Sequence, residues 1–245
     1  MVFHLSVFFA TILFTIGMVF GSISDVFLPW VLMILIATTT RYVFGLWRTL
    51  PSPLNIPLLF TFSSIFLSFI STLLERLIFT VFVSVVYYVL LLGLYRLSRV
   101  PRDLSARAMV AMSAMATMFF FYSAAYGFYI NFTIPLWLFM SVYGASSGVV
   151  TYQYLCLVST DKKTISVYSL VIALALSEIA WVVNFWPFGY LTSGVVVLMF
   201  FYVLFDLAQS EMLHILSRRR TIGYIGLFSC LLLMVLWSSR WRIVA

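Results

Sequence analysis

Charged side chains are scarce in this sequence. Of its 245 residues, 14 are Lys or Arg and 7 are Asp or Glu, so 9% are charged, against the ~25% typical of soluble domains. A water-soluble protein of this size must present many charges at its surface, whereas here 64% of the residues are hydrophobic. The deficit excludes a soluble globular domain and predicts that hydrocarbon surrounds most of the chain.

Residues that usually carry chemistry are also rare. Cys156 and Cys230 lie in apolar stretches, where they act as small hydrophobic residues, so no disulfide framework is expected. With two histidines in all, the chain has no HExxH motif, and it has no P-loop and no lysine inside an apolar segment. We therefore predict no catalytic, cofactor-binding or metal-binding site, and we do not expect an enzyme.

Long apolar runs separated by short polar segments predict an all-α, polytopic bundle of transmembrane helices. The sequence favours one integral membrane domain, residues 1–245, with nine spans. The alternative is eight spans, with one of the first segments interfacial or re-entrant. The expected spans are residues 5–20, 26–47, two spans within 58–95, and 108–126, 135–157, 165–185, 190–207 and 222–237.

Two boundaries follow from less direct signals. Residues 48–57 predict a loop because Pro51, Pro53 and Pro57 each remove a backbone donor and disfavour helix at the preceding residue. Residues 58–95 would form ~57 Å of helix, about twice the thickness of a hydrocarbon core. We place the turn between these two spans at Glu75 and Arg76, although no Gly or Pro marks it.

The distribution of basic residues predicts the orientation, because Lys and Arg collect in cytoplasmic loops. A cytoplasmic N-terminus, in the plasma (inner) membrane of a prokaryote, accounts for most of them. Anionic lipid headgroups are then the expected partner of the basic surface, and nucleic acid is not. The basic residues assigned to the cytoplasmic side are Arg41, Arg48, Arg96, Arg99, Arg102, Arg107, Lys162, Lys163, Arg218, Arg219 and Arg220.

Glu178, in the middle of the seventh span, is the strongest candidate for a functional residue, because an ionisable side chain at membrane depth is costly. Such a carboxyl could exchange a proton or bind a cation, with Gln153 and Asn184 as polar neighbours. The structural alternative is a carboxyl hydrogen-bonded between helices to Gln153, Thr151 or Asn184. A second pair, Arg41 and Asp206, is predicted at a similar depth and fits an intramembrane ion pair.

The segment Gly144-Ala145-Ser146-Ser147-Gly148 resembles the serine motif of rhomboid intramembrane proteases. That resemblance implies Ser146 as a nucleophile and a histidine at the same depth as its base. The later histidine, His214, lies ~20 Å away in depth when residues are counted along the helices, so the dyad fails. Helix packing by Gly144, Ala145 and Gly148 is the preferred interpretation.

The last third of the chain contains Ser177-Glu178-Ile179-Ala180-Trp181, Phe185-Trp186-Pro187-Phe188 and Tyr202 before a basic turn. This pattern resembles uncharacterised multi-spanning membrane proteins of candidate-phylum prokaryotes, a resemblance that implies no activity. The preferred function is a non-enzymatic scaffold or subunit of a membrane assembly with membrane-protein partners. The alternatives are a small proton- or cation-coupled transporter using Glu178 and, third, an intramembrane hydrolase at Ser146.

Overall fold

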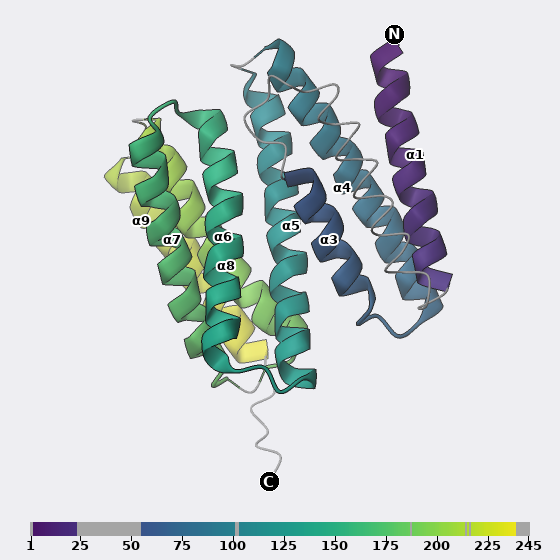
Figure 1. Cartoon of the computed structure of the whole chain (residues 1–245). Helices are drawn as coiled ribbons and strands as arrows, with labels where there is room; N and C mark the ends of the chain where they lie inside the picture. Colours follow the sequence, from purple (N-terminus) through teal and green to yellow (C-terminus); the bar gives the residue numbers. More distant parts are fainter. Residues whose placement is uncertain are drawn as a thin grey trace. The chain divides into compact units, whose positions relative to one another are not determined.

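A computed structural model describes residues 2–23, 55–100, 103–186, 188–213, 215 and 217–238 (Figure 1). These residues form α-helices joined by short connections, and no strand occurs among them, which confirms the all-α class for this part of the chain. The expected span 26–47, with Arg41, lies outside the described residues. The helices are α1 (Val2–Ile23), α3 (Asn55–Leu67), α4 (Leu73–Arg99), α5 (Leu104–Asn131), α6 (Leu136–Val158), α7 (Lys162–Val183), α8 (Tyr190–Met212) and α9 (Arg218–Ser238).

Four of the described helices, α4, α5, α7 and α8, are long and apolar enough to cross a membrane by length and composition. Each expected span within the described residues falls on a helix, and most of these helices extend several residues beyond the predicted bounds. The total of nine spans and the orientation stay predictions. Helical folding satisfies the backbone donors and acceptors internally, as hydrocarbon requires.

The predicted turn at Glu75 and Arg76 is wrong. The chain turns at residues 68–72, and Glu75 lies in the first turn of α4. Thr72 caps this helix, since its hydroxyl accepts a hydrogen bond from the Glu75 amide at 3.4 Å. Arg76 closes the turn by donating from Nε to the Ile70 carbonyl at 2.6 Å. A threonine followed three residues later by a glutamate is a helix-start pattern, and it marks this boundary without Gly or Pro.

The expected loop at residues 48–57 is also too long at its C-terminal end, because α3 already begins at Asn55. Pro57 is the third residue of that helix, where a missing backbone donor breaks no intrahelical hydrogen bond. As described, α3 has 13 residues and a length of roughly 20 Å. It is therefore shorter than a hydrocarbon core of ~30 Å.

The chain divides into two compact units, residues 1–120 and 121–245, and α5 contributes to both. In the first unit α1 packs against α4, as Figure 1 shows. The rings of Phe14 and Tyr87 stack at 4.3 Å, and the Thr15 hydroxyl donates to Ser84 Oγ at 2.9 Å. The interface thus combines a stacked aromatic pair with a hydrogen bond between helices, two contacts that hold helices together in lipid.

The second unit is organised around buried tyrosines. Tyr126 donates its hydroxyl proton to the Ala180 carbonyl of α7 at 2.7 Å, and Tyr143 donates to the Tyr122 carbonyl at 3.2 Å. Tyr122 Oη and Ser147 Oγ share a hydrogen bond at 3.0 Å. Each of these bonds joins two helices, so the tyrosines fix α5 against α6 and α7 while burying large rings.

Glycines allow the closest helix contacts of this unit. A Cβ at Gly144 would lie 3.3 Å from the Ala173 carbonyl oxygen, and one at Gly148 would lie 3.2 Å from Ala173 Cβ. Gly194 of α8 meets the backbone of Ser123 on α5, where a Cβ would lie 3.0 Å from both N and Cα. Small residues at these positions let the helix backbones approach each other.

We expect Gly194→Ala to lower the free energy of unfolding by about 1–3 kcal/mol, because the added methyl meets backbone that cannot rotate away. Gly226→Ala in α9 is the matched control, since nothing lies within 4 Å of its Cβ position. Because alanine has a higher helix propensity than glycine, this variant should leave the free energy of unfolding unchanged or raise it by up to about 1 kcal/mol. Thermal unfolding of both variants in one detergent checks this, and equal midpoints would contradict the packing at Gly194.

Candidate functional site

Glu178 lies on α7, five residues before the helix ends at Val183. It is roughly 8 Å from that end and roughly 24 Å from Lys162 at the other end, so it is not at the centre of the helix. Its side chain is exposed on the protein surface. Within the described residues it has no hydrogen-bond or ion-pair partner.

The two faces of α7 differ sharply. One face is buried against the rest of the second unit and includes Leu176, Ala180 and Val183. Between residues 167 and 185 the other face is exposed and apolar except for Glu178, with Leu174 exposed to 58%, Trp181 to 43% and Phe185, just after the helix, to 69%. The carboxyl therefore stands alone among large hydrophobic groups on a surface that no described part of the chain covers.

Gln153 is not a neighbour of Glu178. Gly144 packs beside Ala173 and Ser177, and Gly148 packs beside Ser169 and Ala173, so α6 and α7 are antiparallel. Extending this register places Gln153 opposite residue 166 of α7. The two side chains are thus separated by roughly 18 Å along the helix axis.

Asn184 forms the C-cap of α7 and donates from Nδ2 to the Tyr129 hydroxyl of α5 at 3.1 Å. Together with the bond from Tyr126 to Ala180, it fastens this end of α7 to α5. Its amide is therefore engaged in joining helices, which is a structural task.

Asp206 lies on α8, six residues before the helix ends at Met212. Its Oδ2 atom is buried and has no hydrogen-bond partner among the described residues. The predicted partner Arg41 is outside those residues, so the ion pair stays a prediction. On the same helix, Phe205 packs its ring 4.6 Å from Tyr154, whose hydroxyl donates to Gln209 Oε1 at 3.2 Å.

The serine motif is a packing surface. Gly144 and Gly148 face α7 at contact distance, which confirms helix packing for these two residues. Ala145 is exposed, so its predicted part in that contact is wrong. Ser146 is half-buried, and His214 lies outside the described residues. Within the described part of the chain, no group of three or more His, Cys, Asp or Glu side chains is arranged to hold a metal ion.

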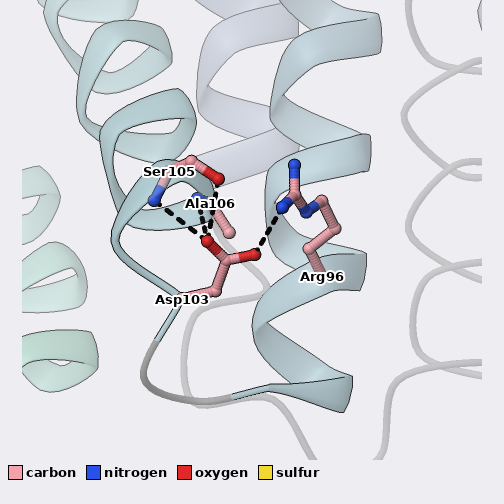
Figure 2. A network of polar contacts seen from close by, with 4 residues as sticks. All are labelled: Arg96, Asp103, Ser105 and Ala106. Carbon is pink, nitrogen blue, oxygen red and sulfur yellow. Dashed lines mark hydrogen bonds and ion pairs between the residues drawn. The ribbon is translucent and has the colours of Figure 1, made fainter.

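A polar cluster that sequence reasoning did not single out lies between α4 and α5 (Figure 2). Asp103 accepts hydrogen bonds from the Ser105 amide at 3.0 Å, the Ser105 hydroxyl at 2.8 Å and the Ala106 amide at 3.2 Å. Its other oxygen pairs with Arg96 Nη2 at 2.7 Å. The carboxylate thus caps α5 and anchors a basic side chain at the end of α4.

The hydrogen bond from the Ser105 hydroxyl, the Ala106 amide and the positive charge of Arg96 lower the pKa of Asp103 below its usual range. Asp161 repeats the arrangement at the start of α7. There, hydrogen bonds from the Thr164 hydroxyl and the Lys163 amide lower the pKa of the carboxyl. Aspartates are favoured at helix starts because they accept hydrogen bonds from backbone N–H groups there. The positive end of the helix dipole also stabilises their negative charge.

A carboxylate whose pKa is lowered in the folded state stabilises the fold above its unfolded pKa of about 3.9, and this contribution is lost as the pH falls through the folded value. When the pH is lowered below ~4, we therefore expect the thermal unfolding midpoint of the wild type to decrease more than that of Asp103→Asn. The amide of that variant still accepts the backbone bonds but carries no charge. Thermal unfolding in detergent between pH 7 and pH 3 measures the difference. Parallel pH profiles of the two proteins would contradict it.

Comparison with known proteins identifies a family for this chain. The model of a family described as "Protein of unknown function (DUF5656)" matches residues 16–238. Neither the curated proteins nor the solved structures contain a match to this chain. The matched segment begins within α1 and ends with α9, and this chain therefore belongs to the DUF5656 family.

Proposed function

We propose that this protein is a non-enzymatic subunit of a membrane assembly and that the exposed face of α7 is where it joins its partner. The observation that carries this proposal is the exposure of Glu178 on an otherwise apolar helix surface near the end of α7. An ionisable residue in lipid is by default a pointer to function. Here the function it supports is association.

The energies favour a covered face over one that contacts lipid. A charged acidic side chain at the centre of a membrane helix costs ~2.5–3.5 kcal/mol, and somewhat less toward the end of the helix, where Glu178 lies. A hydrogen bond between membrane helices contributes ~1–2 kcal/mol in model peptides. A partner helix that offers a polar group to this carboxyl therefore recovers a large part of the cost.

The alternative of a small proton- or cation-coupled transporter uses the same residue differently. A coupling carboxyl needs polar groups around it at its own depth. Gln153 lies roughly 18 Å away along the helices, and Asn184 is bonded to Tyr129. These positions support the subunit over the transporter.

We expect Glu178→Leu to release the protein from its assembly, because leucine offers no hydrogen bond to a partner helix. After extraction from its native membrane in mild detergent, the tagged wild-type chain should migrate on a native gel at a mass above that of a single chain. Glu178→Leu should migrate at a lower mass than the wild type. Glu211→Leu is the matched control, since Glu211 is an exposed acid at the end of α8. Wild type and Glu178→Leu running alike would contradict the proposal.

We further propose nine spans with a cytoplasmic N-terminus in a prokaryotic plasma membrane. The connections at residues 132–135 and 184–189 contain no Lys or Arg, whereas Arg96, Lys162 and Arg219 stand beside the connections on the other side of an alternating bundle. This asymmetry supports a cytoplasmic location for the basic ends, next to anionic lipid headgroups.

Single cysteines test that orientation. In a chain with Cys156 and Cys230 replaced by alanine, Thr133→Cys should react with a membrane-impermeant maleimide in intact cells, because its connection lies outside. Thr160→Cys should react only after the membrane is permeabilised. Both positions are exposed on the protein. The reverse pattern of labelling would overturn the orientation. Equal labelling at both positions would contradict a single membrane span between Thr133 and Thr160.

A further inference from the structure

Two arginines near the C-terminal end of α4 are each held by a contact of their own. Arg96 donates from Nη2 to Asp103 Oδ2 at 2.7 Å, and Figure 2 shows this ion pair beside the start of α5. The guanidinium carbon of Arg99, which is exposed, lies 5.8 Å from the centre of the Tyr95 ring, a cation–π contact. Arg96 and Arg99 are three residues apart, so their side chains are neighbours on the helix surface.

The helices beneath this pair of arginines approach each other closely. A Cβ at Gly93 of α4 would lie 2.9 Å from Met109 Cβ and 3.1 Å from the Ala106 carbonyl oxygen on α5. The two guanidinium groups therefore stand on a tightly packed hairpin, and each has a contact that limits its motion. Arginines arranged in this way suit phosphate oxygens, because a guanidinium can donate two parallel hydrogen bonds to them.

The depth of the two arginines matches that of lipid headgroups. With 27 residues, α4 is roughly 40 Å long, whereas a hydrocarbon core is ~30 Å thick. If α4 is upright and centred in the bilayer, Arg96 lies ~15 Å from the midplane and Arg99 ~20 Å from it. The hydrocarbon ends at ~15 Å and the headgroup layer at ~20–22 Å. Both guanidinium groups thus fall in the layer that contains the lipid phosphates.

Two apolar side chains at the same end of the hairpin also favour contact with the membrane. Val100 follows Arg99 directly and is exposed to 55%, and Leu104, the first residue of α5, is exposed to 76%. Large apolar groups beside basic ones are typical of segments that lie in the membrane interface, where apolar surface is buried near the headgroups.

We propose that this end of the α4–α5 hairpin binds an anionic phospholipid, with Arg96 and Arg99 donating hydrogen bonds to its phosphate. The site requires a membrane at this end of the hairpin, but it depends neither on the proposed orientation nor on the association proposed at α7. Asp103 does not cancel the attraction, because residues 95–107 contain four arginines and one aspartate. A headgroup without an amine gains most from this positive charge.

The basic residues at the start of α7 provide a comparison within the same chain. Lys162 and Lys163 are exposed, and neither side chain has an ion pair or a ring contact within the described residues. A lysine is a mobile, strongly hydrated point charge that cannot form the paired hydrogen bonds of a guanidinium. This end should therefore attract anionic lipid diffusely, whereas the end of α4 should bind it at a defined site.

Lipid titration of the purified chain in mild detergent tests the site, with bound lipid counted by native mass spectrometry. We expect phosphatidylglycerol to bind more tightly than phosphatidylcholine. Arg99→Gln, which leaves the ion pair of Arg96 intact, should raise the dissociation constant of phosphatidylglycerol about fivefold, as ~1 kcal/mol per basic residue at a membrane surface implies. Lys163→Gln is the control, because it removes the same charge elsewhere, and it should leave this constant unchanged.

Arg99→Lys distinguishes hydrogen bonding from charge alone. We expect it to raise the dissociation constant of phosphatidylglycerol as well, because lysine keeps the charge but loses the paired donors. Wild-type affinity in this variant overturns phosphate recognition by Arg99. Equal binding of the two lipids, or equal effects of Arg99→Gln and Lys163→Gln, overturns the site. Displacement of phosphatidylglycerol by an equal concentration of inorganic phosphate overturns a lipid as its ligand and assigns the site to the free anion.

Discussion

Helices surrounded by hydrocarbon gain little from burying apolar surface against one another, so close approach and hydrogen bonding must hold them together. The second unit meets this constraint at specific points. Gly144 and Gly148 let α6 lie against Ala173 of α7, and Gly194 lets α8 lie against Ser123 of α5. Tyrosine hydroxyls then bond the backbone of the neighbouring helix, as Tyr126 does at the Ala180 carbonyl.

The same constraint explains why polar residues inside these helices are weak indicators of function. The hydroxyls of Ser84, Thr117 and Ser147 each donate to the carbonyl four residues earlier, at 2.7 Å. Serine and threonine can therefore satisfy themselves on their own helix. An ionised carboxylate cannot, because it only accepts, and the carbonyls of a helix interior accept as well.

Helix positions were largely predictable from the sequence, because apolar length alone identifies segments such as α7 and α8. Local chemistry was present but overlooked at Thr72, where the capping pattern with Glu75 marks the turn. The neighbours of Glu178 were not predictable. One sequence does not fix the register between helices, so the pairing with Gln153 had no physical basis until the contacts of Gly144 and Gly148 set α6 against α7.

The position along the helix distinguishes Asp103 and Asp161, which are structural acids, from Glu178. Asp103 and Asp161 stand at helix starts, where backbone N–H groups and a positive dipole end stabilise negative charge. Glu178 stands near the end of α7, where the dipole opposes negative charge and the surrounding exposed groups are apolar. Nothing on its own helix compensates for these costs, and no described part of the chain covers it. In the proposed assembly, a polar group of a partner helix would supply this compensation.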